Sequence, residues 1–176
     1  MNITAERNRR KLEEALLSIM KKKPFDLITV SEICEAASLS RATFYHHYAR
    51  TDDVLVSAYE TAHENAFGRR EWTLDYFHSD LFLKDMIRFF DQNTALIAAI
   101  SKWNLLPRVA WLPTKMSYDS SSLLADPYLS KYPQYTTIYL WGNTFDICMA
   151  WILGGKKESR EEMLKMMQYM RKLEQR

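Results

Sequence analysis

The segment from Ile28 to Leu55 carries two helix-start signals, and their spacing leaves room for only a short helix and a tight turn between them. The first signal is Thr29 with Glu32, a capping-box pair in which each side chain accepts a hydrogen bond from the other residue's backbone amide. The second is Ser40, a residue type favoured at helix N-caps. The apolar residues between them share one helical face at Val30, Ile33, Cys34 and Ala37. With a turn at Ser38, this pattern predicts two short helices in a helix-turn-helix arrangement.

The second of these helices has a polar outer face. The residues spaced to face inward are Leu39, Phe44 and Tyr48. The outward set is Arg41, Thr43, His46 and His47, with Tyr45 at the margin. Hydroxyl groups and helix N-terminal amides bind phosphates, whereas Arg and His side chains reach base edges. Because the second helix of a helix-turn-helix enters the major groove, the pattern predicts a DNA-binding surface.

At these residues the sequence resembles the tetracycline-repressor (TetR) family of bacterial regulators, and the similarity is dense over about the first third of the chain. The matching positions are Thr29, Val30, Ile33, Ala37, Leu39, Ser40, Thr43, Phe44, Tyr45 and Tyr48. Three positions depart from the family pattern. Ser38 stands where the turn glycine is usual, and Cys34 where a small residue is usual. Thr51 aligns with a phosphate-contacting lysine; either Arg50 supplies that charge or the contact is lost.

The resemblance and the donor chemistry together assign the DNA contacts. Arg41 is expected to read a base, most simply guanine. His46 and His47 are further candidates for base or phosphate contact, and the hydroxyl side chains are assigned to phosphates. The complete predicted interface is Thr29, Ser31, Ser40, Arg41, Ala42, Thr43, Tyr45, His46, His47 and Thr51.

Helical spacing continues through most of the chain, and the 176 residues contain only 4 Gly and 5 Pro. The sequence therefore predicts an all-α protein in two parts. A helix-turn-helix domain is expected over residues 1–50, and a helical regulatory and dimerisation domain over residues 51–176, with 51–70 as the connecting helix. Further helices are expected at 4–22, after Ser79, at Thr94–Lys102, at Gln134–Leu153 and after Ser159.

Charge alone does not indicate a nucleic-acid partner, because the formal net charge is +2. Residues 1–50 hold nine Lys or Arg and six Asp or Glu, a difference of +3. Cys34 and Cys148 are far apart in apolar surroundings, which favours buried free thiols in a reducing cytoplasm. The chain opens on polar and charged residues rather than a signal peptide, and no apolar run reaches the roughly 18 residues of a membrane span. We therefore expect a cytoplasmic protein without a membrane partner.

Enzyme chemistry is not indicated by the sequence. It contains no Gly-rich phosphate loop, no serine nucleophile elbow and no metal-ligand spacing. The adjacent pairs His46-His47 and His63-Glu64 point about 100° apart on a helix, so neither pair chelates one ion easily. We expect no catalysis, no cofactor and no metal.

Residues 72–151 are rich in aromatic side chains, and two interpretations remain open. Packing in the core and at a dimer interface is favoured. Alternatively, some of these side chains line an apolar cavity for a small apolar or aromatic effector, for which the candidates are Trp103, Trp111, Tyr118 and Phe145. The last two expected helices are predicted to form a homodimer, as in several TetR-like regulators, through Trp141, Trp151, Met163, Met167 and Met170.

The predicted function is that of a dimeric transcriptional repressor, released from a palindromic operator in double-stranded DNA by an effector. One alternative keeps the fold and changes the role to an activator or protein-partnered coregulator without a small ligand. Another alternative is a small helical enzyme or ligand carrier whose helix-turn-helix serves only as scaffold.

Overall fold

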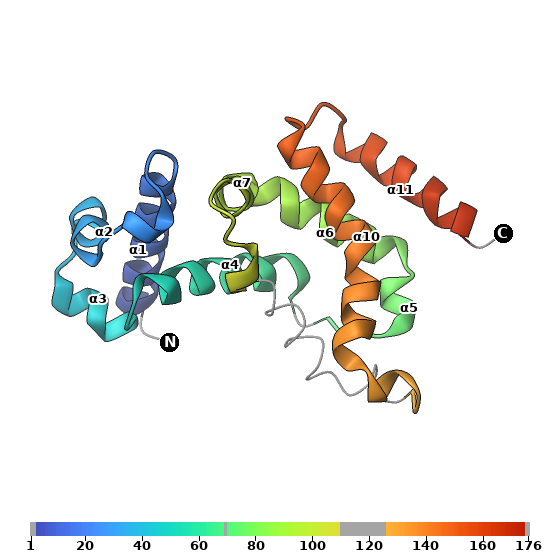
Figure 1. Cartoon of the computed structure of the whole chain (residues 1–176), viewed down its shortest axis with the longest axis horizontal. Coiled ribbons are helices and arrows are strands. Elements are labelled where there is room, and N and C mark those ends of the chain that lie inside the picture. The colour runs from blue at the N-terminus through green and yellow to red at the C-terminus, as the bar shows by residue number, and fades with distance from the viewer. Residues whose placement is uncertain (1–2, 69, 110–125, 175–176) are drawn as a thin grey trace.

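The computed structural model of this chain describes residues 3–68, 70–109 and 126–174, and those residues form helices without a β-strand among them. The first part contains α1 (Ile3–Met20), η1 (Phe25–Leu27), α2 (Val30–Ala37) and α3 (Arg41–His47). The remainder contains α4 (Thr51–Phe67), α5 (Leu74–Phe77), α6 (Asp80–Gln92), α7 (Thr94–Lys102), α8 (Leu106–Val109), η3 (Leu129–Lys131), α10 (Pro133–Leu153) and α11 (Arg160–Glu174). The all-α prediction is confirmed. In Figure 1, α1–α3 lie at one end of the molecule and α4 runs from them toward α6, α10 and α11.

The helix-turn-helix forms through the predicted caps. The Thr29 hydroxyl accepts a hydrogen bond from the Glu32 amide over 3.3 Å, and Glu32 accepts one from the Thr29 amide over 2.9 Å. The Ser40 hydroxyl accepts from the Thr43 amide over 3.0 Å. Between the two helices Ser38 takes the left-handed conformation with φ 54°, so a serine occupies a backbone position that favours glycine.

The three N-terminal helices enclose a small apolar core. Its fully or nearly fully buried side chains are Leu12, Leu16, Met20, Ile33, Cys34, Ala37, Phe44 and Tyr48. Phe44 is the central contribution of α3 and is 0% exposed, so truncating it to alanine would cost about 3–5 kcal/mol. This burial fixes the rotation of α3 about its axis, and the rotation decides which α3 side chains face solvent.

Below this core a buried polar network joins α1, α3 and α4. The Glu13 carboxylate accepts hydrogen bonds from the hydroxyls of Tyr48 over 3.1 Å and Ser57 over 2.7 Å. Arg9 donates to the Ser57 hydroxyl over 2.8 Å. Burial raises the pKa of the Glu13 carboxyl, although the hydrogen bonds from Ser57 and Tyr48 act in the opposite direction.

In the other part of the molecule α6 is central, because α4, α10 and α11 all pack against it. Asp85 on α6 is 1% exposed, and its charge is matched by three donors. Arg70 donates to it over 3.0 Å, Tyr76 over 2.8 Å and Arg88 over 2.7 Å. Arg88 also donates to the Ala66 carbonyl near the end of α4. The cluster therefore holds the end of α4 and the residues that follow it against α6.

The connection between α10 and α11 is held to the end of α6. Gly155 follows α10 with φ 86°, a conformation that favours glycine. Lys156 and Arg160 both form ion pairs with Asp91 of α6. The predicted capping box at the start of α11 is present, since Glu162 accepts from the Ser159 amide over 2.8 Å and donates its own amide to Ser159 over 3.2 Å.

Candidate nucleic-acid interface

The outer face of α3 presents the residues that the sequence assigned to DNA. Arg41, Ala42, Tyr45 and His46 are exposed, and Thr43 and His47 are half-buried. The inward set is also as predicted, with Phe44 and Tyr48 buried and Leu39 packed against the core. This face of α3 is therefore available to a partner.

Arg41 and Tyr45 are paired across one turn of α3. The guanidinium of Arg41 donates a hydrogen bond to the Tyr45 hydroxyl over 3.4 Å. Its central carbon lies 5.9 Å from the centroid of the Tyr45 ring. Tyr45 is 52% exposed, so the pair projects into solvent and restricts the directions that the guanidinium can take. A guanidinium held in this way is suited to bidentate contact with a base edge or a phosphate.

Hydroxyl groups gather at the first turns of α2 and α3. The Ser40 and Thr43 side-chain oxygens lie 2.9 Å apart at the start of α3. Ser31 is exposed on the first turn of α2. Thr29 is occupied as the α2 cap, because its hydroxyl is 2.9 Å from Glu32 Oε2 as well as accepting the Glu32 amide. The geometry thus gives Thr29 a structural role and leaves Ser31, Ser40 and Thr43 at the surface of the helix starts.

The two adjacent histidines end α3 with their rings in contact, at a centroid separation of 5.2 Å. His47 also lies 6.3 Å from the Tyr48 ring, on the inner side. Burial, together with the charge of His46, lowers the pKa of His47. His46 is the more exposed of the two, so it is the histidine better placed to meet a partner.

Thr51 begins α4 and is half-buried. Arg50 precedes it with a side chain that is 76% exposed, and its nearest acidic group, Asp53, is 4.0 Å away. The Asp53 carboxylate accepts hydrogen bonds from the backbone amides of Ala49 over 3.0 Å and Arg50 over 2.9 Å, which fixes the chain where α4 starts. Arg50 thereby places a cation beside the position that Thr51 occupies.

Only two of the four predicted effector residues, Trp103 and Phe145, lie in the described part of the chain, and each has a packing contact of its own. Trp103 is partly buried, and its indole nitrogen donates to the Met20 carbonyl over 2.8 Å, so its position is explained by a contact between α7 and α1. Phe145 packs on Phe90, with a centroid separation of 5.1 Å. Trp111 and Tyr118 lie outside the described residues. Packing rather than a shared cavity accounts for Trp103 and Phe145.

His63 on α4 is a buried polar residue whose burial sequence reasoning missed, because its neighbour Glu64 invited only a metal interpretation. Its side chain is 1% exposed, and neither ring nitrogen has a hydrogen-bond partner among the described residues. The surrounding rings are Phe67 at 4.5 Å, Trp72 at 5.7 Å, Trp141 at 5.7 Å and Phe89 at 6.2 Å. Burial lowers the pKa of His63 to about 4, so the ring is neutral at neutral pH. The available signal was its position on the apolar face of α4, beside Tyr59 and Phe67.

The predicted dimer residues mostly lie inside the single chain. Trp141 and Trp151 are 6% and 5% exposed, and Met163 and Met167 are 2% and 3% exposed. Met170 is at the surface, with 43% of its area exposed. The periodicity identified a buried face correctly, but α6 of the same chain covers it.

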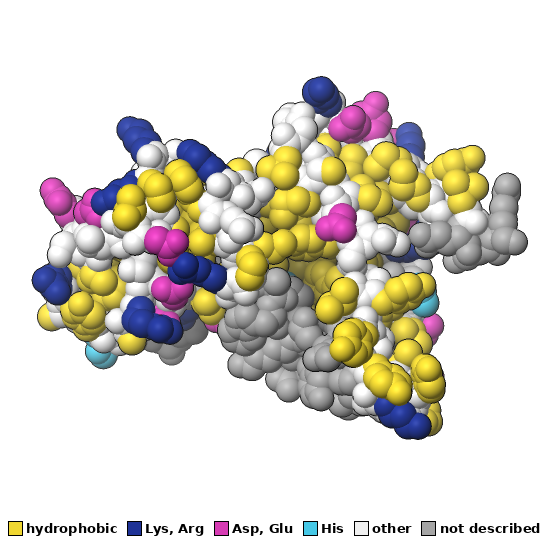
Figure 2. All heavy atoms as spheres, in the orientation of Figure 1, with side chains coloured by type: hydrophobic (Ala, Val, Ile, Leu, Met, Phe, Trp, Pro, Cys, Tyr) yellow, Lys and Arg dark blue, Asp and Glu magenta, His cyan; other side chains and the backbone are white. Residues whose placement is uncertain are grey.

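The exposed large apolar side chains of α10 and α11 are Tyr135, Ile138, Tyr139, Leu153, Tyr169, Met170 and Leu173. Figure 2 shows hydrophobic side chains gathered over this part of the molecule.

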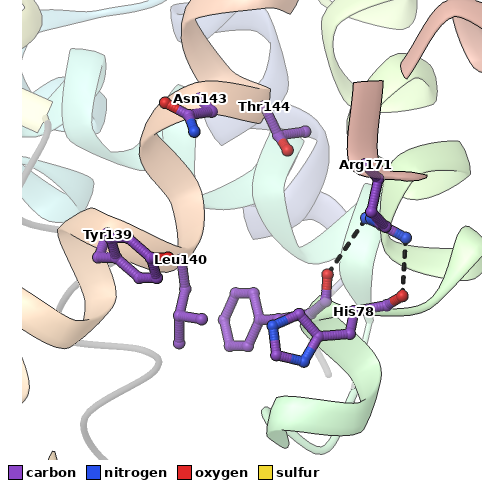
Figure 3. Close-up of a pocket in the computed structure, with 7 residues that line it drawn as sticks. His78, Tyr139, Leu140, Asn143, Thr144 and Arg171 are labelled. Atoms are coloured by element: carbon purple, nitrogen blue, oxygen red, sulfur yellow. Dashed lines mark hydrogen bonds between the residues drawn. The ribbon is translucent and has the colours of Figure 1, made fainter. Parts of the chain in front are cut away.

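A surface pocket of about 240 Å³ opens between α5, α10 and α11 (Figure 3). It is lined by Phe77, His78, Tyr139, Leu140, Asn143, Thr144 and Arg171. Arg171 of α11 donates to the carbonyls of His78 over 2.7 Å and Phe77 over 3.3 Å. Its guanidinium thus holds α11 to the end of α5 and forms one wall of the pocket.

The described residues contain neither a cluster of metal ligands nor a helix that could span a membrane. Within residues 3–68, 70–109 and 126–174, no three His, Cys, Asp or Glu side chains are grouped so that they could hold a metal ion. Among the same residues, no helix combines the length and the apolar character needed to cross a membrane.

Comparison with known proteins supports the assignment of the N-terminal helices. None of the curated proteins matches this chain. The fold is similar to the crystal structure of Lin0861 from Listeria innocua, with a TM-score of 0.63 and 15% sequence identity, over 98% of this chain and 93% of that chain. At this identity the similarity shows the fold alone. Residues 14–58 match the model of the bacterial regulatory proteins of the tetR family. That segment contains the whole of α2 and α3 with their caps, and its match supports a DNA-binding transcriptional regulator of the tetR family.

Proposed function

We propose that this regulator is a homodimeric repressor that binds a palindromic operator through α3 and leaves it when a small effector binds. The observation that carries the proposal is the outer face of α3, where Tyr45 holds the Arg41 guanidinium over 3.4 Å. The hydroxyls of Ser40 and Thr43 lie on the first turn of the same helix. A guanidinium suits a guanine edge, and hydroxyls at a helix start suit phosphates. Such a regulator works in the bacterial cytoplasm, where the DNA is, and we assign it no catalytic role.

Dimerisation is supported by the outer surface of α10 and α11. Tyr139 is 80% exposed there, an unusual environment for an aromatic side chain in a protein that acts alone. One turn further along α10, a Cβ added to Gly142 would meet no atom of the described residues within 4 Å. A second helix can therefore approach the α10 backbone closely at Gly142. A two-fold dimer would place two copies of α3 in successive major grooves, about 34–36 Å apart.

Effector binding is supported by His63. A buried polar group without a hydrogen-bond partner costs about 1–3 kcal/mol, and neither ring nitrogen of His63 has a partner in the described part of the chain. A bound ligand that supplies the partner would account for a histidine in an aromatic cluster. A small aromatic or apolar molecule with one hydrogen-bonding group would satisfy His63 and pack on Phe67 and Trp72. Because α4 carries His63 and begins shortly after α3, displacement of α4 would move α3. A ligand that prefers the displaced form would weaken DNA binding by its difference in affinity.

The experiment is selection of bound sequences from a random duplex pool at near-physiological salt, followed by fluorescence titration of the enriched sequence and light scattering of the protein. A palindromic sequence bound with nanomolar affinity by a dimer is the expected result. Mass spectrometry of the purified protein then tests for a bound small molecule. Binding of DNA without any ligand or ligand response would favour an activator or partner-dependent coregulator. Absence of all salt-sensitive DNA binding would favour a helical carrier or enzyme.

A further inference from the structure

One short segment of the regulatory part, from the end of α7 through α8, contacts the DNA-binding part at separate points. Lys102 donates to the Lys21 carbonyl over 2.9 Å, and Trp103 donates to the Met20 carbonyl over 2.8 Å. Both acceptors are at the C-terminal end of α1, where carbonyls have no partner within the helix. In Figure 1, α7 and α8 lie between the N-terminal helices and the α6–α10–α11 group. The segment is therefore the physical link between the two parts beside α4.

Arg108 on α8 makes the most specific of these contacts. One terminal nitrogen lies 2.5 Å from the Asp26 carboxylate in η1, and the other lies 2.7 Å from the Asp52 carboxylate in the first turn of α4. The guanidinium carbon is 5.0 Å from the ring centroid of Phe25, which is buried in the N-terminal core. A single planar group thus holds the turn before α2 and the start of α4.

We infer that Arg108 is a positioning residue for DNA binding, which sets the orientation of the helix-turn-helix relative to α4 and the regulatory part. The inference rests on the proposed function and names a part of its regulation. Each ion pair is partly exposed and worth little on its own. Their joint effect is geometric, because the fork of a guanidinium fixes the relative position of the two elements that it bridges.

Arg108 also has a route to the regulatory core. Its neighbours Leu105 and Val109 are 2% and 0% exposed, so the two ends of this short segment are packed into the interior. A change in the core that shifts α8 must move the guanidinium relative to Asp26, Asp52 or both. The orientation of α3 is then coupled to the state of the regulatory part, because such a shift would break or retain these ion pairs.

The first arm of the test compares operator affinities. Arg108→Met should weaken binding about three- to tenfold, because the exposed pairs that it breaks are individually weak. The slope of binding against salt should stay unchanged, whereas loss of a phosphate contact would lower it by about one. Lys84→Met, which removes an exposed cation from α6, is the matched control and should leave affinity unchanged.

The second arm uses Asp26→Asn, for which the positioning role and simple electrostatics predict opposite results. Removing a negative charge from a DNA-binding domain should tighten binding on electrostatic grounds, and Glu35→Gln on α2 is the control for that effect. If Asp26 holds Arg108, Asp26→Asn should instead weaken binding. Combined with Arg108→Met it should add no further loss, because Arg108→Met has already broken the pair with Asp26. Tighter binding by Asp26→Asn would overturn the inference.

The third arm needs no DNA. Hydrogen exchange of the free protein should become faster in Arg108→Met at residues 25–28 and 51–54, by about threefold or more, and stay unchanged in Lys84→Met. Unchanged exchange at both segments would also overturn the inference. If the wild-type protein enriches no operator, the proposed function fails, and the exchange measurement alone decides the role of Arg108.

Discussion

The hydroxyl of Tyr48, at the C-terminal end of α3, donates a hydrogen bond to the buried carboxylate of Glu13 on α1 over 3.1 Å. Ser57 on α4 donates to the same oxygen over 2.7 Å. Glu13→Leu should destabilise the protein by about 1–3 kcal/mol, because the buried Ser57 hydroxyl loses its acceptor and Tyr48 keeps only the Ser57 oxygen, at 3.1 Å. Urea unfolding measures this loss. The exposed neighbour Glu14 provides the control, and Glu14→Leu should change stability by less than about 0.5 kcal/mol.

Glu13→Gln separates the hydrogen bonds from the charge, since a glutamine oxygen still accepts from both hydroxyls. Burial raises the pKa of Glu13 in the folded protein above its unfolded value of 4.5. As the pH falls, the Glu13 carboxyl therefore binds a proton at a higher pH in the folded state than in the unfolded state. Once it is protonated, the folded state no longer bears the free-energy cost of a buried negative charge. Relative to wild type, Glu13→Gln should be more favourable at pH 7 than at pH 4. An equal difference at both pH values would contradict a raised pKa.

Ser38→Gly should stabilise the helix-turn-helix. Ser38 has φ 54°, and the left-handed region costs a residue with a Cβ about 1–2 kcal/mol. The flexibility of glycine in the unfolded chain offsets part of this, so we expect a net gain of about 0.5–1 kcal/mol. Thermal unfolding is the measurement. Ala36→Gly, two residues earlier inside α2, should have the opposite sign because its backbone is helical. If both glycines destabilise, strain at Ser38 is not the controlling factor.

Local patterns were the part of this structure that sequence could predict. The Thr29–Glu32 and Ser159–Glu162 capping boxes depend on residues three apart, so the sequence contains all the information needed for them. Burial of Phe44 likewise followed from the spacing on α3.

The features that the sequence could not supply depend on which surfaces meet. Periodicity shows that Trp141 and Met163 belong to apolar faces, but it does not show whether another subunit or α6 covers them. His63 is buried by residues distant in sequence, including Phe89 and Trp141. Arg108 and Asp26 are separated by 82 positions, so their ion pair follows from the packing of α8 and not from any motif.

Arg41→Ala should weaken operator binding by about 1–3 kcal/mol and relax specificity at one base-pair position. The reason is that Arg41 projects from α3 with its direction restricted by Tyr45. Binding titrations against operators substituted at each position measure both effects. Arg50→Ala is the comparison, because loss of a phosphate contact should weaken binding to all sequences equally. A uniform loss for Arg41→Ala would reassign Arg41 to the phosphate backbone.

His63 should make folding sensitive to mild acid. The pKa of His63 is about 4 in the folded protein against 6.5 for an unperturbed histidine, because burial disfavours the charged ring. As the pH falls, His63 therefore binds a proton in the unfolded state before it does so in the folded state. This favours the unfolded state, so the free energy of unfolding decreases between pH 6.5 and pH 4. Relative to His63→Leu, wild type should lose about 3 kcal/mol across this range.

Unfolding free energies of both proteins at several pH values test this expectation, with the exposed His46→Leu as control. The same variant tests the effector site, since His63→Leu removes the polar group while retaining an apolar side chain of similar volume. Operator release by any effector found should be impaired in it. If release is intact, the effector binds elsewhere, whatever the pH dependence.

Gly142→Leu should separate folding from dimerisation. Among residues 3–68, 70–109 and 126–174, no atom lies within 4 Å of a Cβ added at Gly142, and leucine has a higher helix propensity than glycine. The subunit should therefore fold at least as well, with a gain of up to about 1 kcal/mol in α10. A leucine side chain would, however, hold a second α10 away from the backbone. Light scattering should then show a shift from dimer to monomer at micromolar concentration, with unchanged helical content by circular dichroism.

Lys84→Leu on α6 controls for the added apolar surface, and this variant should remain dimeric. A dimer that tolerates Gly142→Leu would show that the subunits meet on another face, and the exposed residues of α11 around Tyr169 would be the next to test.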